Sequence, residues 1–208
     1  ARGPVVIVGA GQAGMQLATG LRQLGSTAPI TLLGDEAWPP YERPPLSKAY
    51  LAGELERERL WFRREKAYAE QDVDLRLGTR ATAIDRGAKT VTTDRGDVLP
   101  YETCVLATGA RARRLDVPGA ELAGVHVLRG LDDADRLRDA LRPGLEVAVV
   151  GGGYIGMEIA ASLTKLGGKV TVVEAAPRIM SRGVAPLVAD HVARRHQEDG
   201  VRLETGAG

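Results

Sequence analysis

The stretch that decides the fold is Gly151-Gly152-Gly153-Tyr154-Ile155-Gly156-Met157-Glu158, whose glycines are spaced as G-x-G-x-x-G. This spacing alone is a weak signal, so its neighbours decide its meaning. An apolar run at residues 147–150 precedes it as an expected strand, and an expected helix with an apolar stripe follows, ending at Gly167. In such a unit the glycines allow a tight turn, the approach of a pyrophosphate, and helix–strand contact. The stretch therefore predicts the phosphate-binding turn of a dinucleotide-binding βαβ unit.

An acidic residue stands where such a unit holds its nucleotide. The second expected strand, residues 169–173, leads into Glu174. That position lies about 20 residues beyond the glycines, where a carboxylate accepts a hydrogen bond from a ribose 2′-OH. We therefore expect Glu174 to bind the adenosine ribose.

The chain carries the same pattern a second time near its N-terminus. Its parts are an expected strand at residues 4–8, the glycines Gly9, Gly11 and Gly14, a helix at residues 12–24, a strand at residues 30–33, and the acids Asp35 and Glu36. Two such units predict two bound dinucleotides, and hydride transfer from a nicotinamide to a flavin is the chemistry that uses such a pair. The alternative is one true site and one glycine-rich turn kept for packing.

The predicted fold class is α/β, with two Rossmann-like dinucleotide-binding domains that each contain a parallel sheet. A polar connector begins at Arg111, Arg113 and Arg114, so we expect a FAD-type domain at residues 1–114 and a NAD-type domain at residues 115–208. The expected elements outside the two glycine units are a helix at residues 49–70, short strands within residues 73–99, a strand at 101–107, a strand at 124–128, helices at 132–141 and 186–198, and a strand at 201–204.

Composition and charge argue against several classes of function. The 208 residues carry a net charge of +1, which does not indicate a nucleic-acid partner. The longest apolar run is too short to span a membrane. Cys104 is the only cysteine, which excludes a redox dithiol within this chain and makes a cytoplasmic setting the default expectation. The three histidines, His126, His191 and His196, show no metal-ligand spacing, so no metal site is expected.

The segment Tyr41-Glu42-Arg43-Pro44-Pro45-Leu46-Ser47-Lys48-Ala49-Tyr50-Leu51 is more specific than the glycines. Together with the two fingerprints and Ala107-Thr108-Gly109, it resembles the FAD-dependent, NADH-oxidising ferredoxin reductases. These are the putidaredoxin and rhodocoxin reductase type and the reductase components of aromatic-ring dioxygenases, within the two-dinucleotide-domain flavoproteins. The resemblance covers essentially the whole chain.

The resemblance implies a set of FAD contacts. They are Gly9, Gly11, Gln12, Ala13 and Gly14 for the pyrophosphate, Asp35 or Glu36 for the adenosine ribose, Arg43, Pro45 and Lys48 along the flavin, and Ala81, Thr108, Gly109 and Arg129 for further contacts.

The resemblance likewise implies an NADH site. Its residues are Gly151, Gly153, Tyr154, Ile155 and Gly156 for the pyrophosphate region and Glu174 for the ribose. Tyr154 is expected to cover the flavin until nicotinamide displaces it, and Glu158 to pair with Lys48 near the reactive ring nitrogen. The charge of Glu174 would repel a 2′-phosphate, which favours NADH over NADPH.

The activity implied by the resemblance is hydride transfer from NADH to FAD, followed by single-electron transfer to a ferredoxin-type iron–sulfur protein of a monooxygenase or ring-hydroxylating dioxygenase. The alternatives are a rubredoxin reductase or NADH oxidase of the same fold, or a nucleotide-binding module without turnover. Arginines are plausible docking groups for an acidic ferredoxin, although a solvated linker accounts better for Arg111, Arg113 and Arg114. Such reductases extend well beyond residue 208, so we expect a fragment whose FAD retention is open.

Overall fold

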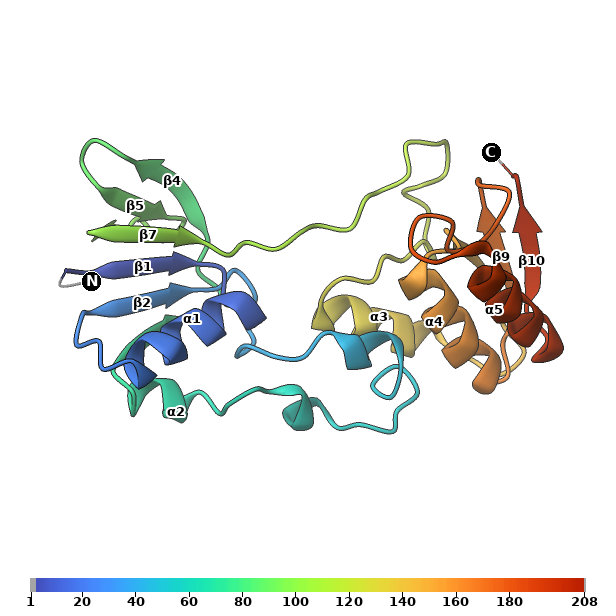
Figure 1. Ribbon diagram of the computed structural model, residues 1–208, viewed down its shortest axis with the longest axis horizontal. Coiled ribbons are helices and arrows are strands. Elements are labelled where there is room, and N and C mark those ends of the chain that lie inside the picture. Colours follow the sequence, from blue (N-terminus) through green and yellow to red (C-terminus); the bar gives the residue numbers. More distant parts are fainter. Residues whose placement is uncertain (1–2, 208) are drawn as a thin grey trace. The chain divides into compact units, whose positions relative to one another are not determined.

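The structure is a computed structural model that describes residues 3–207. The chain forms two compact units (Figure 1). The first unit combines Ala1–Glu42 with Glu58–Arg111, and the second combines Arg43–Arg57 with Ala112–Gly208. Sequence analysis expected residues 43–57 in the first domain, whereas in the structure they pack with the second unit.

The first unit is built on a four-stranded parallel sheet of order β3-β2-β1-β7. Its strands are β1 (Val5–Val8), β2 (Ile30–Leu33), β3 (Val73–Arg76) and β7 (Thr103–Leu106). The unit also contains α1 (Gln12–Gln23), α2 (Lys66–Ala69) and an antiparallel sheet of order β4-β5-β6, formed by β4 (Ala81–Asp85), β5 (Thr90–Thr93) and β6 (Val98–Pro100).

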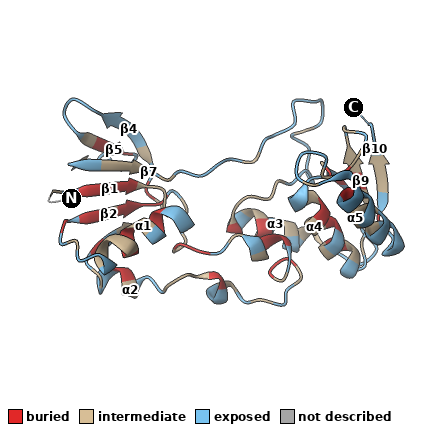
Figure 2. Ribbon diagram, viewed as in Figure 1, coloured by how far each residue is buried: buried red, intermediate tan, exposed pale blue. Residues whose placement is uncertain are grey.

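The alternation of side chains along β1 explains why this sheet is covered on both faces. Val5 and Ile7 belong to a core cluster with Met15 of α1. Val6, one residue along, belongs instead to a cluster with Val91 of β5. Successive strand residues point to opposite faces, so a continuous apolar run is what a sheet covered on both sides requires. Figure 2 shows β1 and β2 among the buried segments.

The second unit contains a three-stranded parallel sheet of order β10-β9-β8. Its elements are β8 (Glu146–Val150), β9 (Lys169–Glu174), β10 (Arg202–Thr205), α3 (Leu131–Ala140), α4 (Tyr154–Lys165), α5 (Pro186–Glu198) and the 3-10 helix η1 (Pro44–Ser47). Val149 and Val172 pack with Met157 and Leu163 of α4 in one core cluster. Val150 is 60% exposed, so the opposite face of β8 is open in the described chain.

Both glycine units were predicted correctly as strand, helix and strand, and the parallel sheets confirm the α/β class. The helix expected at residues 49–70 was wrong: this region holds only the 3-10 helix η2 (Arg57–Leu60) and the short α2. Its buried residues Leu51, Leu60 and Tyr68 are eight or nine positions apart, which cannot form one helical face. The strand expected at residues 124–128 was also wrong, because this segment has no ladder partner. Within residues 3–207, none of the helices combines the length and apolarity needed to cross a bilayer.

Candidate dinucleotide-binding sites

The first glycine turn joins β1 to α1 and has the geometry that a phosphate cradle needs. Gly9 has a φ of +118°, a conformation that other residues rarely adopt. A Cβ on Gly14 would overlap the carbonyl oxygen of Gly9, so helix and turn can touch only because Gly14 has no side chain. A Cβ on Gly11, by contrast, would meet nothing within 4 Å. The turn is therefore packed at its first and third glycines and open at its second.

The second turn, between β8 and α4, repeats the positive φ of the first glycine, the tight third glycine and the open second glycine, but a Cβ on its first glycine, Gly151, would meet nothing within 4 Å. Gly151 has a φ of +104°, and a Cβ on Gly156 would overlap the carbonyl oxygen of Gly151. A Cβ on Gly153 would meet nothing within 4 Å. The space beside the second glycine is therefore open in both turns.

Both helices leave their first turn without a side-chain cap. Gly11 and Gly153 are the N-cap residues of α1 and α4, both extended and both without a side-chain capping bond. The first N–H groups of a helix have no partner inside the helix, and together with the helix dipole they attract anions. Gln12 and Ala13 are exposed in the first turn of α1, as Tyr154 and Ile155 are in that of α4. The residues of both turns thus fit a diphosphate group.

Glu174 ends β9 and folds back over the second turn. Its Oε2 accepts a hydrogen bond from the Gly152 N–H at 2.7 Å, and its Oε1 accepts one from the Ala176 N–H at 2.8 Å. The carboxylate is thus held beside the glycine turn by backbone groups from both sides. This is the place where sequence analysis expected a ribose ligand.

The two acids that follow β2 are held differently. Glu36 accepts a hydrogen bond from the Tyr41 hydroxyl, and exposed Asp35 forms an ion pair with Arg80 at 3.6 Å. Sequence analysis left open which acid holds a ribose. The structure adds Arg80 as a neighbour of Asp35, which no motif had indicated.

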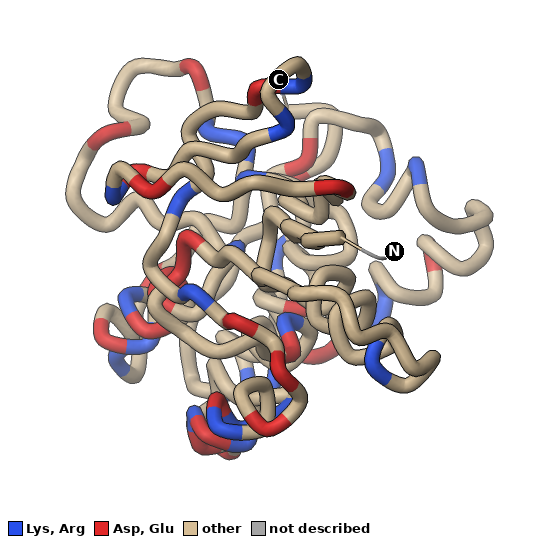
Figure 3. The backbone as a smooth tube through the Cα atoms, turned by 90° about the vertical axis from the view of Figure 1, so that its left-hand side faces the viewer, with Lys and Arg blue, Asp and Glu red and all other residues tan. Residues whose placement is uncertain are grey.

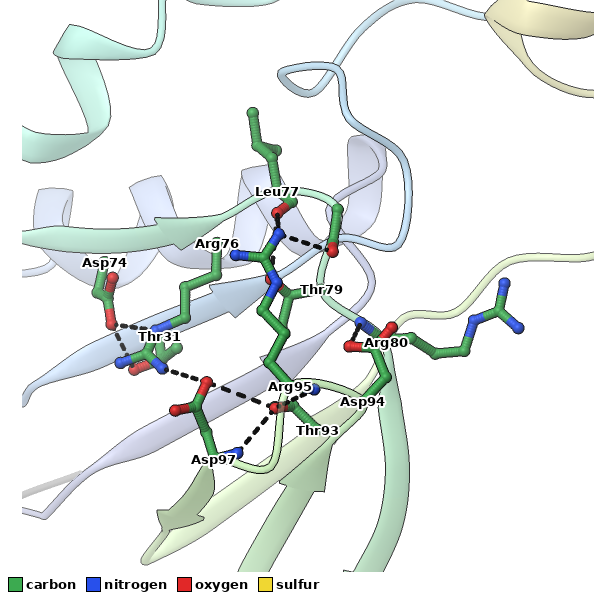
Figure 4. Close-up of polar contacts among 11 residues, drawn as sticks. Thr31, Asp74, Arg76, Leu77, Thr79, Arg80, Thr93, Asp94, Arg95 and Asp97 are labelled. Atoms are coloured by element: carbon green, nitrogen blue, oxygen red, sulfur yellow. Dashed lines mark hydrogen bonds and ion pairs between the residues drawn. The ribbon is translucent and has the colours of Figure 1, made fainter.

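A polar network fixes the loop that follows β3 (Figure 4). The Arg95 guanidinium donates to the carbonyls of Leu77 and Gly78 at 3.1 and 2.9 Å. The same segment is hydrogen-bonded to the turn after β2, because the Gly78 N–H donates to the Glu36 carbonyl at 2.9 Å and the Thr79 N–H to the Gly34 carbonyl at 2.8 Å. Arg95 therefore braces the turn that carries Asp35 and Glu36. No sequence motif indicated this role, because a side chain in the turn after β5 bonds backbone carbonyls of the loop after β3.

The other expected contacts of the first unit lie around the end of β7 and the start of β4. Thr108 and Gly109 are exposed directly after β7, and Gly109 has a φ of +69°. Ala81 is half-buried at the first position of β4. Arg129 belongs to the second unit, where its carbonyl accepts a hydrogen bond from Arg43 at 2.8 Å.

The structure brings Lys48 and Glu158 together, as the resemblance implied. Lys48 Nζ lies 2.6 Å from Glu158 Oε2 and 3.2 Å from the Pro44 carbonyl. Ser47 Oγ donates to the same Glu158 oxygen at 2.6 Å. Burial by itself would raise the pKa of the Glu158 carboxyl, but the hydrogen bonds from Lys48 and Ser47 and the charge of Lys48 outweigh it, so the pKa is lowered. The Glu158 carboxylate is therefore ionised at neutral pH.

A second cluster fixes residues 43–57 to α3. Tyr50 is buried, and its hydroxyl donates to Asp135, whose other oxygen accepts a hydrogen bond from Arg57 at 2.7 Å. Arg138 lies 4.8 Å from the centre of the Tyr50 ring. Burial, followed by the hydrogen bond to Asp135, raises the pKa of Tyr50. This cluster holds the segment that carries Arg43, Pro45 and Lys48, and no sequence signal had indicated it.

Tyr154 stands at the first position of α4 and is 54% exposed. Its hydroxyl donates to the Gly183 carbonyl at 3.1 Å. The ring therefore lies against the loop that follows β9, next to the second glycine turn.

Two glycine turns, each followed by an acidic residue and each built on a parallel sheet, are features of proteins that bind two dinucleotides. The chain belongs to the pyridine nucleotide-disulphide oxidoreductase family, whose sequence profile matches residues 3–208.

Individual relatives narrow the comparison. A probable ferredoxin reductase of Castellaniella defragrans is 44% identical over 97% of this chain and 49% of its own length. A rubredoxin-NAD(+) reductase of Pseudomonas putida is 44% identical over 98% of this chain and 53% of its own length. The crystal structure of a covalent putidaredoxin reductase–putidaredoxin complex matches with a TM-score of 0.92 and 42% identity, over 98% of this chain and 49% of that one. The chain thus spans about half the length of the relatives that it matches.

Proposed function

We propose that this chain is the nucleotide-binding part of an NADH-dependent, FAD-containing ferredoxin reductase. One observation carries the proposal: a single chain contains two glycine turns in which the third glycine touches the carbonyl of the first and the second glycine is open. One dinucleotide needs one such turn, so two turns support a pair of dinucleotides that exchange a hydride. The names of the relatives, ferredoxin and rubredoxin reductases, agree with this use.

The turn after β1 would hold FAD and the turn after β8 would hold NADH. Asp35 or Glu36 would bind the adenosine ribose of the first nucleotide, and Glu174 that of the second. When bound, FAD would accept a hydride and release electrons one at a time. The protein's contribution to such a transfer is orientation, exclusion of water and electrostatics.

Lys48 is the residue proposed to act on the flavin. Its ammonium is held by Glu158 and by the Pro44 carbonyl, so its position is defined before any nucleotide binds. A cation beside the ring favours the reduced, anionic form. We expect Lys48→Ala to slow flavin reduction by NADH in stopped-flow measurements, with the rate compared on protein that has FAD bound, and an unchanged rate would remove Lys48 from this role.

An absorbance spectrum tests the proposal directly. The purified chain, reconstituted with FAD and freed of excess by gel filtration, should be yellow and should bleach when NADH is added without oxygen. A protein that binds NADH in isothermal titration but takes up no flavin would instead be a nucleotide-binding module. The cytoplasmic location expected from the sequence stays a prediction.

The acceptor is proposed to be a ferredoxin-type iron–sulfur protein, with rubredoxin as the second candidate because one relative is named a rubredoxin reductase. Lysine and arginine positions are interspersed with acidic ones along the backbone (Figure 3). Arg114 is paired with Glu121 at 3.3 Å, which makes it a weaker docking candidate. Steady-state NADH oxidation with ferredoxins and a rubredoxin, at several salt concentrations, separates these acceptors; rates that do not depend on salt would count against docking by charge.

A further inference from the structure

The contacts between α4 and η1 form a clamp with two parts. Ser162 Oγ donates to the Ser47 carbonyl at 2.7 Å, and Ser47 Oγ donates to Glu158 Oε2 at 2.6 Å. Glu158 and Ser162 are one turn apart on α4, so both face η1. Ser47 is thus held through its backbone by one helix residue while its side chain holds another.

Ser47 and Lys48 bind the same oxygen of Glu158. Its side chain is buried, and its hydroxyl shares Glu158 Oε2 with the Lys48 ammonium. Because Oε2 accepts hydrogen bonds from both groups, the Glu158 carboxylate cannot rotate without losing one of them. Lys48 adjoins Ser47 in the chain, so a single carboxylate oxygen sets the positions of both side chains.

We propose that Ser47 is a positioning residue that acts through Glu158 to fix the Lys48 ammonium. This inference rests on the proposed function, because fixing the ammonium matters only if Lys48 serves a flavin. Ser47 itself needs no contact with a nucleotide for this role.

The groups that act on Glu158 can be enumerated from the elements around it. Lys48 and Ser47 approach from η1. Other polar side chains near α4 have different partners: Glu174 holds the Gly152 and Ala176 amides, Lys169 pairs with Glu146, and His196 contacts the Met157 carbonyl. Hydrogen bonds to a carboxylate lower its pKa. Loss of the Ser47 hydroxyl should therefore move the titration of Glu158 to higher pH.

The first test is a carboxyl titration by NMR with glutamate labelled at the carboxyl carbon, in which Glu158→Gln assigns the signal. In Ser47→Ala the Glu158 midpoint should move to higher pH. The matched control is Thr164→Ala, because Thr164 lies on the same helix and its hydroxyl bonds the Ala160 carbonyl at 2.8 Å. The control should leave the midpoint unchanged. An unchanged midpoint in Ser47→Ala would overturn the assignment, and this measurement needs no flavin.

The second test is a double-mutant cycle on flavin reduction by NADH. Ser47→Ala should slow reduction on the order of 3- to 10-fold, which corresponds to the net contribution of one typical hydrogen bond. In a Glu158→Gln background the same change should have almost no further effect, because the residue through which Ser47 acts has lost its charge. Equal effects in both backgrounds would overturn the inference. Failure of the wild-type chain to be reduced by NADH would instead contradict the proposed function, whatever the NMR titration shows.

Discussion

Substitutions at the second and third glycines of the second turn, Gly153 and Gly156, should separate an effect on NADH binding from an effect on folding stability. Gly153→Ala places a methyl group where nothing lies within 4 Å, at an exposed position with an extended φ of −79° and ψ of −175°. An L-residue adopts this conformation without strain. Gly156→Ala instead places a methyl group onto the carbonyl oxygen of Gly151. That atom belongs to the backbone and cannot rotate away, so helix and turn must move apart.

The expected changes in stability and in NADH affinity follow from the surroundings of the two glycines. Overpacking costs about 1–3 kcal/mol, and the higher helix propensity of alanine returns about 1 kcal/mol, so Gly156→Ala should lower the free energy of unfolding by up to about 2 kcal/mol. Gly153→Ala should lower it by less than about 1 kcal/mol, because only an N-cap glycine is replaced. Its effect should appear in NADH affinity, which we expect to fall about tenfold or more, since the methyl group occupies the space proposed for the pyrophosphate and tenfold corresponds to about 1.4 kcal/mol.

Urea unfolding followed by circular dichroism gives the stabilities, and isothermal titration with NADH gives the affinities. Wild-type affinity in Gly153→Ala would refute the phosphate site at this turn. A gain of about 1 kcal/mol in Gly156→Ala, which is the helix-propensity gain without any overlap, would refute the argument that helix contact requires the third glycine. Gly11 and Gly14 form the equivalent pair for FAD in the first unit, with the same expected contrast.

Three further outcomes are expected. Gly20→Ala should stabilise the protein by about 0.5–1 kcal/mol, because Gly20 lies inside α1 with nothing within 4 Å of an added Cβ; a loss of stability in urea would contradict this. Tyr68→Phe should stabilise it by about 1 kcal/mol, because the buried Tyr68 hydroxyl has no hydrogen-bond partner within residues 3–207. Burial raises the pKa of Tyr68 from 10.0 to about 12, so the wild type should lose stability as the pH rises from 10.0 towards 12, because the unfolded phenol deprotonates first, whereas Tyr68→Phe should not; a wild type and variant with parallel stability curves from pH 9 to 12 would exclude that linkage. Glu174→Gln should improve binding of NADPH relative to NADH by about tenfold, since a negative charge beside the 2′-phosphate is removed; an unchanged ratio in titrations with both nucleotides would show that another group decides the preference.

Local patterns in the sequence determined most of the fold. Each glycine turn was predicted because strand and helix periodicities change at the glycines, and those periodicities depend only on residues close in the chain. The same reasoning failed for residues 49–70, where many charged residues favoured a helix. There Leu51 packs in the core cluster of the second unit whereas Leu60 belongs to the first unit, and tertiary packing overrides local propensity.

The resemblance, and not spacing, suggested that Lys48 meets Glu158. The tertiary structure added what holds them: Ser47 and Ser162, more than 100 positions apart in the chain, and Tyr50 with Asp135. Likewise, only the fold showed that Arg95 braces the turn carrying Asp35.

The sequence by itself therefore determined the two nucleotide turns and their terminal acids, because these are written in glycine spacing and apolar periodicity over about 30 residues. Only the tertiary structure decided which unit residues 43–57 join and which side chains fix Lys48. Those contacts join segments far apart in the chain, and which of many possible polar partners meet depends on how helices and strands pack, which no local pattern encodes.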